Sequence, residues 1–215
     1  MFIILILYKM TIYIVITASL IDSNYDERKD LYIKGITQTI QLFKDIPNTH
    51  IVIVENTGKQ SSFLDSFGIP VLYTNTNEIV TNNKGIKEIK DVFNCITHFN
   101  MKDDDFLIKI TGRYYIHNTT FINIIKNFNT KSYDAVLRYG GYNLPEIYME
   151  KFYSCITGLI GMKVSYVKMI EIPDETTCVE FKWADIANTI PYENLCILDN
   201  LGITQYISYG LIVDS

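Results

Sequence analysis

Two hydrophobic patterns alternate along the first half of the chain. Residues 11–17 and 51–55 are nearly continuous apolar runs rich in Ile and Val, a pattern typical of strands covered on both faces. Residues 71–73 and 106–110 repeat this pattern in shorter form. We therefore predict four buried strands in this part of the chain.

Amphipathic segments separate these strands. The spacing of apolar residues predicts helices over about 27–43 and 86–99, and a shorter helix around 61–67. Strands that alternate with helices indicate β-α-β units, a mainly parallel sheet and right-handed crossovers. Residues 11–115 are therefore expected to form a doubly wound, Rossmann-like half.

The second half, about 116–215, has a less regular order of elements. Apolar runs predict strands at 135–139, within 155–162, at 195–198 and at 205–211, and a helix at about 177–190. No internal repeat and no Pro-, Gly- or Ser-rich linker separates the halves, so we expect a single domain over residues 1–215.

Residues 1–9 precede the first strand as a short apolar stretch. They lack the basic start and the small-residue cleavage site of a signal peptide, and they fall short of the ~20 apolar residues that span a bilayer. We expect an N-terminal extension, packed on the sheet edge or poorly ordered, and no stable membrane span. A weak membrane anchor is the alternative.

Charge and cysteine use narrow the classes of function. The net charge of −5 argues against a nucleic-acid partner, because a phosphate-backbone binder shows a basic face. The four cysteines form no C-x-x-C pair, which favours buried, reduced thiols and a cytoplasmic location. The three histidines have no metal-ligand spacing with another His or Cys, which argues against zinc.

Polar residues follow the carboxyl ends of the predicted strands, where an open parallel sheet binds its ligands. The segment at 82–85 lies between a strand end and a helix start, where backbone N–H groups favour phosphate oxygens. Glu55 is expected to accept hydrogen bonds from a ribose or base. The predicted nucleotide-contacting residues are Thr17, Ser19, Arg28, Glu55, Asn83, Lys84, Thr111 and Gly112.

Some of these residues have a purely structural alternative. Arg28 also fits a solvated position at a helix start, and Asn83 with Lys84 also fits plain helix capping.

Lys109 and Arg113 flank the end of the fourth predicted strand. Loss of a nucleoside diphosphate requires negative charge to be stabilised on the leaving phosphate. Arg113 offers a bidentate fork and Lys109 a compact charge, and Gly112 between them lets the backbone approach a ligand. Burying a lysine in an apolar central strand costs free energy, which favours a functional role for Lys109. The alternatives are a snorkelling Lys109 and a surface ion pair for Arg113.

Residues 109–114 resemble the K-x-[ST]-G-R-Y signature of small GT-A-like glycosyltransferases found in bacterial surface-polysaccharide clusters and large DNA viruses. Residues 155–162 resemble the acceptor-side strand of that group, and 199–203 its closing segment. The resemblance implies a GT-A-like α/β fold, a mixed, mainly parallel sheet flanked by helices, with a nucleotide-sugar-binding half over about 11–115 and an acceptor half over about 116–215. It also implies transfer of a sugar from a nucleotide-diphosphate donor to a glycan or other hydroxyl acceptor, in the host cytoplasm for a viral protein.

Many GT-A enzymes carry Asp-x-Asp at the end of the fourth strand, where it holds Mn²⁺ or Mg²⁺ against the diphosphate. This chain has Lys109-Ile110-Thr111 there, and its acidic run at 103–105 precedes the strand, where we expect a solvated turn. We predict that Lys109 and Arg113 act in place of a metal. Mn²⁺ or Mg²⁺ is left open, and the nucleotide sugar is a co-substrate rather than a resident cofactor.

An inverting transferase needs a carboxylate that deprotonates the acceptor hydroxyl. Asp174, Glu175 and Glu180 are candidates, and we predict Glu175. Residues 177–180 match a capping box, in which Glu180 would bind the backbone at Thr177; contact with the acceptor is its other role. Tyr142 is expected to contact the acceptor, whereas Trp183 is expected in the core. A retaining enzyme would require no such base.

Two other functions fit the same topology. A sugar-nucleotide nucleotidyltransferase normally has a Gly-rich, basic loop after the first strand, but residues 18–24 contain no Gly, Lys or Arg. A catalytically inactive, carbohydrate-binding relative is compatible with the absence of Asp-x-Asp. The sequence specifies neither the donor base and sugar nor the oligomeric state.

Overall fold

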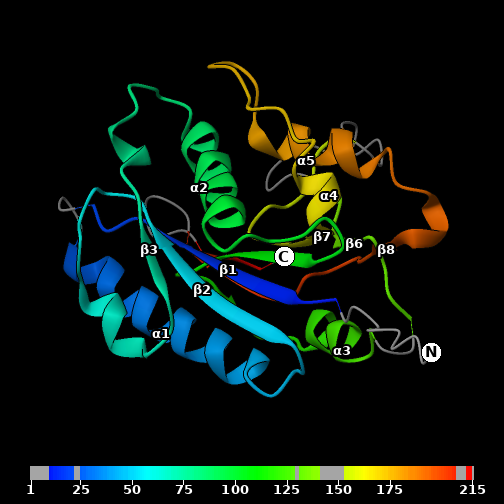
Figure 1. Ribbon diagram of the computed structural model, residues 1–215, viewed down its shortest axis with the longest axis horizontal. Coiled ribbons are helices and arrows are strands. Elements are labelled where there is room, and N and C mark those ends of the chain that lie inside the picture. Colours follow the sequence, from blue (N-terminus) through cyan, green and yellow to red (C-terminus); the bar gives the residue numbers. More distant parts are fainter. Residues whose placement is uncertain (1–9, 22–24, 129–130, 141–152, 207–211, 215) are drawn as a thin grey trace, which may run out of the picture.

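The computed structural model describes residues 10–21, 25–128, 131–140, 153–206 and 212–214, and it places helices on both faces of one large sheet (Figure 1). The predicted extension at 1–9 and the predicted acceptor contact Tyr142 lie outside these ranges. Within them, no helix has the length and apolar character needed to cross a membrane.

The large sheet has seven strands in the order β3-β2-β1-β4-β7-β6-β8. All neighbours pair in parallel except β7, which runs antiparallel to both β4 and β6. This arrangement confirms the predicted mixed, mainly parallel sheet. The strands are β1 (Ile12–Ala18), β2 (Thr49–Glu55), β3 (Val71–Tyr73), β4 (Phe106–Thr111), β6 (Ala135–Leu137), β7 (Leu159–Lys163) and β8 (Leu195–Ile197).

Helices cover both faces of this sheet, as expected for β-α-β units. In Figure 1, α1 and α3 lie below the sheet, and α2, α4 and α5 lie above it. A second, antiparallel sheet has the order β10-β9-β5. These elements are α1 (Tyr25–Phe43), α2 (Lys84–His98), α3 (Thr120–Lys126), α4 (Val164–Val167), α5 (Val179–Ala187), β5 (Tyr115–Ile116), β9 (Ile203–Tyr206) and β10 (Ile212–Asp214).

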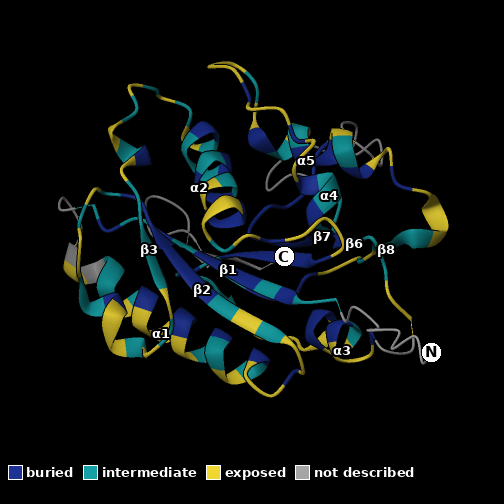
Figure 2. Cartoon of the chain, in the orientation of Figure 1, coloured by how far each residue is buried: buried dark blue, intermediate teal, exposed yellow. Residues whose placement is uncertain are grey.

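The period of two along each strand divides the buried side chains between the two faces of the sheet. On β4, Ile108 and Ile110 pack into the core beneath the sheet with α1 and α3. Leu107 points the other way, into the core formed with α2, α4 and α5. Lys109 has the same parity as Leu107, so the strand directs it toward the face that these helices cover. Figure 2 shows the central strands as almost continuously buried.

Several predicted boundaries in the second half need correction. The apolar stretch at 155–162 enters the sheet only from Leu159 onward, and the helix predicted over 177–190 spans Val179–Ala187. Short elements were missed, among them α3, α4 and β5. Segments of two to seven residues contain too few turns or alternations for a period to be recognised. Short 3₁₀ turns complete the chain at Phe63–Phe67, Thr76–Glu78 and Tyr192–Asn194.

Gly35 and Gly112 bring α1 against the end of β4. A Cβ added at Gly35 would lie 2.7 Å from the Tyr114 carbonyl oxygen and closer still to that of Gly112. A Cβ at Gly112 would lie 2.9 Å from a methyl carbon of Ile16. Both glycines are therefore required by packing inside the protein. This corrects the expectation that Gly112 opens the backbone to a ligand.

We expect Gly35→Ala to destabilise the protein by about 1–3 kcal/mol, because the added methyl group meets rigid backbone carbonyls. Equilibrium urea unfolding gives the change as a lower midpoint at unchanged slope. Thr37→Ala, at an exposed position of the same helix, is the matched control and should change stability little. A Gly35→Ala midpoint equal to that of Thr37→Ala would contradict the close approach.

Candidate functional site

Two adjoining cavities open at the carboxyl ends of the central strands. The first, of about 400 Å³, lies over the ends of β1 and β2 and is called the β1 cavity. The second, of about 480 Å³, lies between β4, α2 and the start of α5 and is called the α5 cavity. The two share the lining residues Asn82, Lys84, Glu88 and Thr111. Both cavities therefore lie at the edge of the sheet where the strand-end rule predicts a ligand.

The β1 cavity is lined by four cationic side chains and two acidic ones. Arg28 donates to the Ser19 carbonyl at 3.2 Å, and Lys87 donates to the Asn77 carbonyl at 2.8 Å. These bonds anchor two cations at the wall, beside Thr17 and Ser19 of the same lining. The cations are Arg28, Lys84, Lys87 and Arg113, and the acids are Glu88 and Asp91.

Arg113 lies at the rim where β4 has ended. Its guanidinium carbon is 5.9 Å from the centre of the Tyr114 ring. Burial raises the pKa of the nearby Tyr32 hydroxyl, while the charges of Arg113 and Arg28 oppose that rise. Both arginines line the β1 cavity together with Tyr32.

Glu55 does not line either cavity, although it ends β2 at the predicted edge. The side chain is fully buried, and its carboxylate accepts bonds from the backbone N–H groups of Leu20 and Thr57 and from the Thr57 hydroxyl. These bonds fasten the loop after β1 to the end of β2. The predicted contact of Glu55 with ribose or base is therefore corrected to a role in holding the loop.

A buried polar network that the sequence did not reveal lies next to Glu55. Asn56 donates to Asp91 of α2 at 2.9 Å, and the hydroxyls of Thr74 and Thr76 donate to the other carboxylate oxygen. Burial raises the pKa of Asp91, and these three hydrogen bonds oppose the rise. Asn56 Oδ1 is buried without a hydrogen-bond partner among the described residues. The network ties α2 to the ends of β2 and β3.

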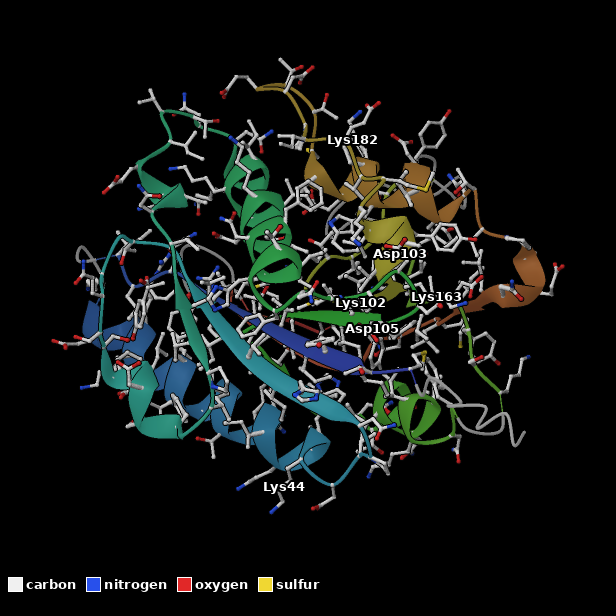
Figure 3. The ribbon with its side chains drawn as sticks, in the orientation of Figure 1. Lys44, Lys102, Asp103, Asp105, Lys163 and Lys182 are labelled. Carbon is white, nitrogen blue, oxygen red and sulfur yellow. The ribbon has the colours of Figure 1, made fainter. Side chains whose placement is uncertain are left out.

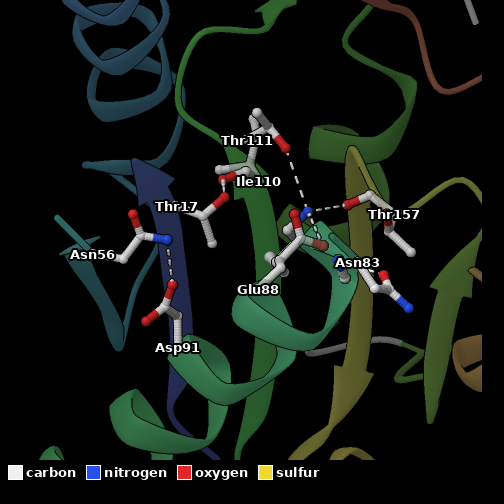
Figure 4. Close-up of polar contacts among 10 residues, drawn as sticks. Thr17, Asn56, Asn83, Glu88, Asp91, Ile110, Thr111 and Thr157 are labelled. Atoms are coloured by element: carbon white, nitrogen blue, oxygen red, sulfur yellow. Dashed lines mark hydrogen bonds and ion pairs between the residues drawn. The ribbon is translucent and has the colours of Figure 1, made fainter. Parts of the chain in front are cut away.

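Lys109 is buried at the wall of the α5 cavity, with 1% of its side chain exposed. Its ammonium group lies 2.8 Å from Glu88 Oε1, 2.7 Å from the Thr157 carbonyl oxygen and 3.3 Å from the Thr111 hydroxyl (Figure 4). An ammonium group has three hydrogens, so all of them have partners. Glu88 of α2, which the sequence analysis missed, compensates this charge.

The donor set at the end of β4 does not fit a divalent cation. A site for Mn²⁺ or Mg²⁺ needs several oxygen ligands, usually including carboxylates. Here the buried ammonium of Lys109 occupies the end of the strand, and Glu88 is already paired with it. Among the described residues, no group of three or more His, Cys, Asp or Glu side chains is arranged to hold a metal.

The acidic run at 103–105 lies at the opposite, amino end of β4, as predicted (Figure 3). Asp103 pairs with Lys168 at 2.6 Å. Asp105 is buried, not solvated as expected, and accepts bonds from the backbone of Thr11 and Lys102. A carboxylate that satisfies two backbone N–H groups fixes the turn into β4.

Glu180 lies in the first turn of α5 and lines the α5 cavity. The predicted capping box is wrong, because the helix begins after Cys178 and has no side-chain cap. Burial raises the pKa of Glu180, and the charge of Glu88 adds to the rise. A bond to its own backbone, the charge of Lys109 and a bond from the Thr157 hydroxyl oppose it.

The loop before α5 is held to the start of α2 by Asn83. Its side-chain oxygen accepts from the Gly85 N–H, which confirms the capping alternative, and its amide nitrogen donates to the carbonyls of Asp174 and Thr177 at 2.6 and 2.8 Å. Asp174 caps its own loop, and bonds from Thr176 and Thr177 lower its pKa to about 2.

Glu175 is exposed and lines the α5 cavity, where it accepts a bond from the Thr81 hydroxyl at 2.9 Å. Lys84 is exposed and lines both cavities. Trp183 is buried in the core, as expected. Of the cysteines, Cys95 and Cys155 are buried as predicted, but Cys178 is exposed.

Comparison with known proteins supports the fold. No family model and no curated protein matches the sequence. The structure is similar to a mannosyltransferase of Pyrobaculum calidifontis solved with GDP-Man and Mn²⁺, with a TM-score of 0.55, 9% identity and coverage of 95% of this chain and 59% of the other. It is also similar to S. aureus TarS, with a TM-score of 0.54, 14% identity and coverage of 90% and 60%.

A further structure of S. aureus TarS, in complex with UDP-GlcNAc, has a TM-score of 0.53 at 13% identity and covers 90% of this chain and 58% of the other. This chain thus spans about three fifths of the length of these structures. The shared architecture shows that the chain has a GT-A-like α/β fold, as the sequence predicted.

The contacts of Asn83 predict two separable effects. Asn83→Asp retains an oxygen that caps α2 but cannot donate to Asp174 and Thr177, whereas Asn83→Ala loses both functions and about 1 kcal/mol of capping energy. We expect both variants to speed hydrogen exchange at the backbone amides of 174–178, and only Asn83→Ala to lower the unfolding midpoint clearly. Unchanged hydrogen exchange in both variants would contradict the role of Asn83 in holding the loop before α5.

Proposed function

We propose that the protein is a glycosyltransferase that moves a sugar from a nucleotide-diphosphate donor to a glycan or similar hydroxyl acceptor. The observation that carries the proposal is the pair of adjoining cavities at the strand ends of a GT-A-like fold. One cavity is lined by an excess of cations and the other by Glu175 and Glu180. The proposed setting is that of the small surface-polysaccharide or large-virus enzymes, in the cytoplasm.

The donor nucleotide is assigned to the β1 cavity. Arg113 and Arg28 supply guanidinium forks for phosphate oxygens, and Lys84 adds a charge at the boundary with the α5 cavity. Thr17 and Ser19 line the same wall and offer polar contacts to the nucleoside. The solved relatives named above bind GDP-Man and UDP-GlcNAc, which supports a nucleotide sugar as the ligand class.

The two predicted cations take different tasks in this proposal. Arg113 stabilises the leaving diphosphate, because it lines the cavity that holds the donor. The charge of Lys109 is compensated by Glu88 within the protein, so Lys109 holds the wall between the cavities and Thr111 in place. The transferred sugar then lies over Thr111, which both cavities share.

The acceptor hydroxyl is assigned to the α5 cavity, where an inverting reaction needs a proton acceptor. Glu175 was the candidate from the sequence. Glu180 has the stronger case, since a partly buried carboxyl with a raised pKa in a cavity is typical of an acid–base group. Its carboxylate takes the hydroxyl proton as the oxygen attacks the anomeric carbon and the diphosphate departs. Tyr142 remains a proposed acceptor contact.

A thermal-shift panel tests the proposed function. We expect one class among UDP-, GDP-, CMP- and dTDP-sugars, at a hundredfold excess over Kd, to raise Tm by roughly 5 °C or more without Mn²⁺. Nucleoside triphosphates and free glycans complete the panel. Stabilisation by a triphosphate alone would favour a nucleotidyltransferase, and by a glycan alone a carbohydrate-binding relative. No response to any nucleotide sugar would refute the proposal.

Arg113→Ala is expected to reduce turnover of the donor identified in this way by at least tenfold. The reason is that the leaving diphosphate loses the guanidinium group that stabilises its negative charge. The unfolding midpoint should stay close to that of the wild type, since Arg113 lies at the rim. Arg113→Lys keeps the charge without the fork and should recover part of the rate. A wild-type rate in Arg113→Ala would remove Arg113 from the proposed mechanism.

A further inference from the structure

A continuous line of contacts runs across the wall between the two cavities. It begins at Glu88 on α2, passes through Lys109 on β4 and Thr157 before β7, and ends at Glu180 on α5. Lys109 Nζ lies within hydrogen-bonding distance of Glu88, Thr111 and the Thr157 carbonyl, and Figure 4 labels these three partners. Segments far apart in sequence thus meet around one buried ammonium group.

Thr157 links the two charged parts of this line. Its backbone carbonyl accepts the 2.7 Å bond from Lys109, and hydrogen bonding from its side chain lowers the pKa of Glu180. The side chain is buried, and the next residue holds β4, because the Gly158 carbonyl accepts from the Thr111 N–H at 3.0 Å. A displacement of Lys109 therefore moves the group that orients Glu180.

Glu88 determines where Lys109 sits. It is half-buried, with 27% of its side chain exposed, and its Oε1 lies 2.8 Å from the ammonium nitrogen. The network of Asp91, one turn further along α2, fixes this part of the helix against β2 and β3. The acid that compensates Lys109 is thus held on a rigid element rather than on a loop.

We propose that Glu88 and Lys109 are positioning residues for Glu180: Glu88 anchors Lys109, and Lys109 holds Thr157, which orients the Glu180 carboxyl at the wall of the α5 cavity. This inference rests on the proposed function, in which Glu180 accepts the proton of the acceptor hydroxyl. It adds a role for Glu88, which contributes no predicted contact to the donor or the acceptor.

The same arrangement gives the two residues opposite electrostatic effects on Glu180. The negative charge of Glu88 raises the pKa of Glu180, and the positive charge of Lys109 lowers it. Other groups act on Glu180 or share its cavity but stay unchanged in the variants below. They are Lys84 on α2, Tyr114 after β4, Cys155 before β7, and Glu175 and Cys178 before α5.

The direct test is a titration of the Glu180 carboxyl followed by ¹³C NMR in the free protein, with Glu180→Gln used to assign the signal. Glu88→Gln removes the charge that raises the pKa, so its midpoint should move to lower pH. Lys109→Met removes the charge that lowers the pKa, so its midpoint should move to higher pH. The opposite signs report the two charges, and the Thr157 variants below report the contact that orients the carboxyl.

Two comparisons complete the experiment. Asp103→Asn breaks an exposed Asp–Lys pair at the other end of the sheet and should leave the Glu180 midpoint unchanged. Thr157→Val removes the hydroxyl and should shift the midpoint to higher pH, whereas Thr157→Ser should restore it. If Lys109→Met does not fold, Glu88→Gln and the two Thr157 variants still test the positioning role.

The activity arm is read separately. In the transferase assay, the acidic limb of kcat/KM should follow the NMR midpoints of Glu88→Gln and Lys109→Met, and Glu180→Gln should lose at least a hundredfold in kcat while Glu175→Gln loses far less. Unmoved or same-direction NMR midpoints overturn the positioning role. Opposite NMR shifts in a protein that binds no nucleotide sugar would support that role and refute the proposed function alone.

Discussion

One buried ammonium group constrains the whole wall of the site. The alternation of β4 turns Lys109 toward the face covered by α2 and α5, where an uncompensated charge would cost several kcal/mol. The surrounding segments therefore present Glu88, the Thr157 carbonyl and the Thr111 hydroxyl to its three hydrogens. Because these partners come from α2, from β4 and from the segment before β7, satisfying Lys109 fixes those elements relative to one another.

This constraint also separates two kinds of chemistry. The cation inside the wall is compensated, whereas the cations of the β1 cavity, including Arg113, line the space that we propose for the anionic donor. On the other side, Glu180 lies in a partly buried setting that favours its protonated form and suits proton exchange. Leaving group and nucleophile are thus assigned to opposite sides of one wall, and the sugar to the junction at Thr111.

Much of the fold could be predicted because buried parallel strands appear as nearly continuous apolar runs. Their order along the chain fixed which ends share an edge, which was enough to bring Thr17, Thr111 and Arg113 together. Side-chain partners could not be predicted in this way: Glu55 is engaged by the loop after β1. Glu88 was missed because helix periodicity does not show which acid faces a buried lysine. A lysine on the covered face of β4 requires a compensating acid, so Lys109 itself was the signal in the sequence that such a residue exists.

A crystal structure of the protein with the nucleoside diphosphate of its best donor tests the central claim most directly. We expect the diphosphate in the β1 cavity, within hydrogen-bond distance of the Arg113 guanidinium, with the Lys109–Glu88 pair intact behind it and no divalent cation between phosphate and protein. A diphosphate bound through a metal at the end of β4, with Glu88 released from Lys109 to ligate it, would contradict the account.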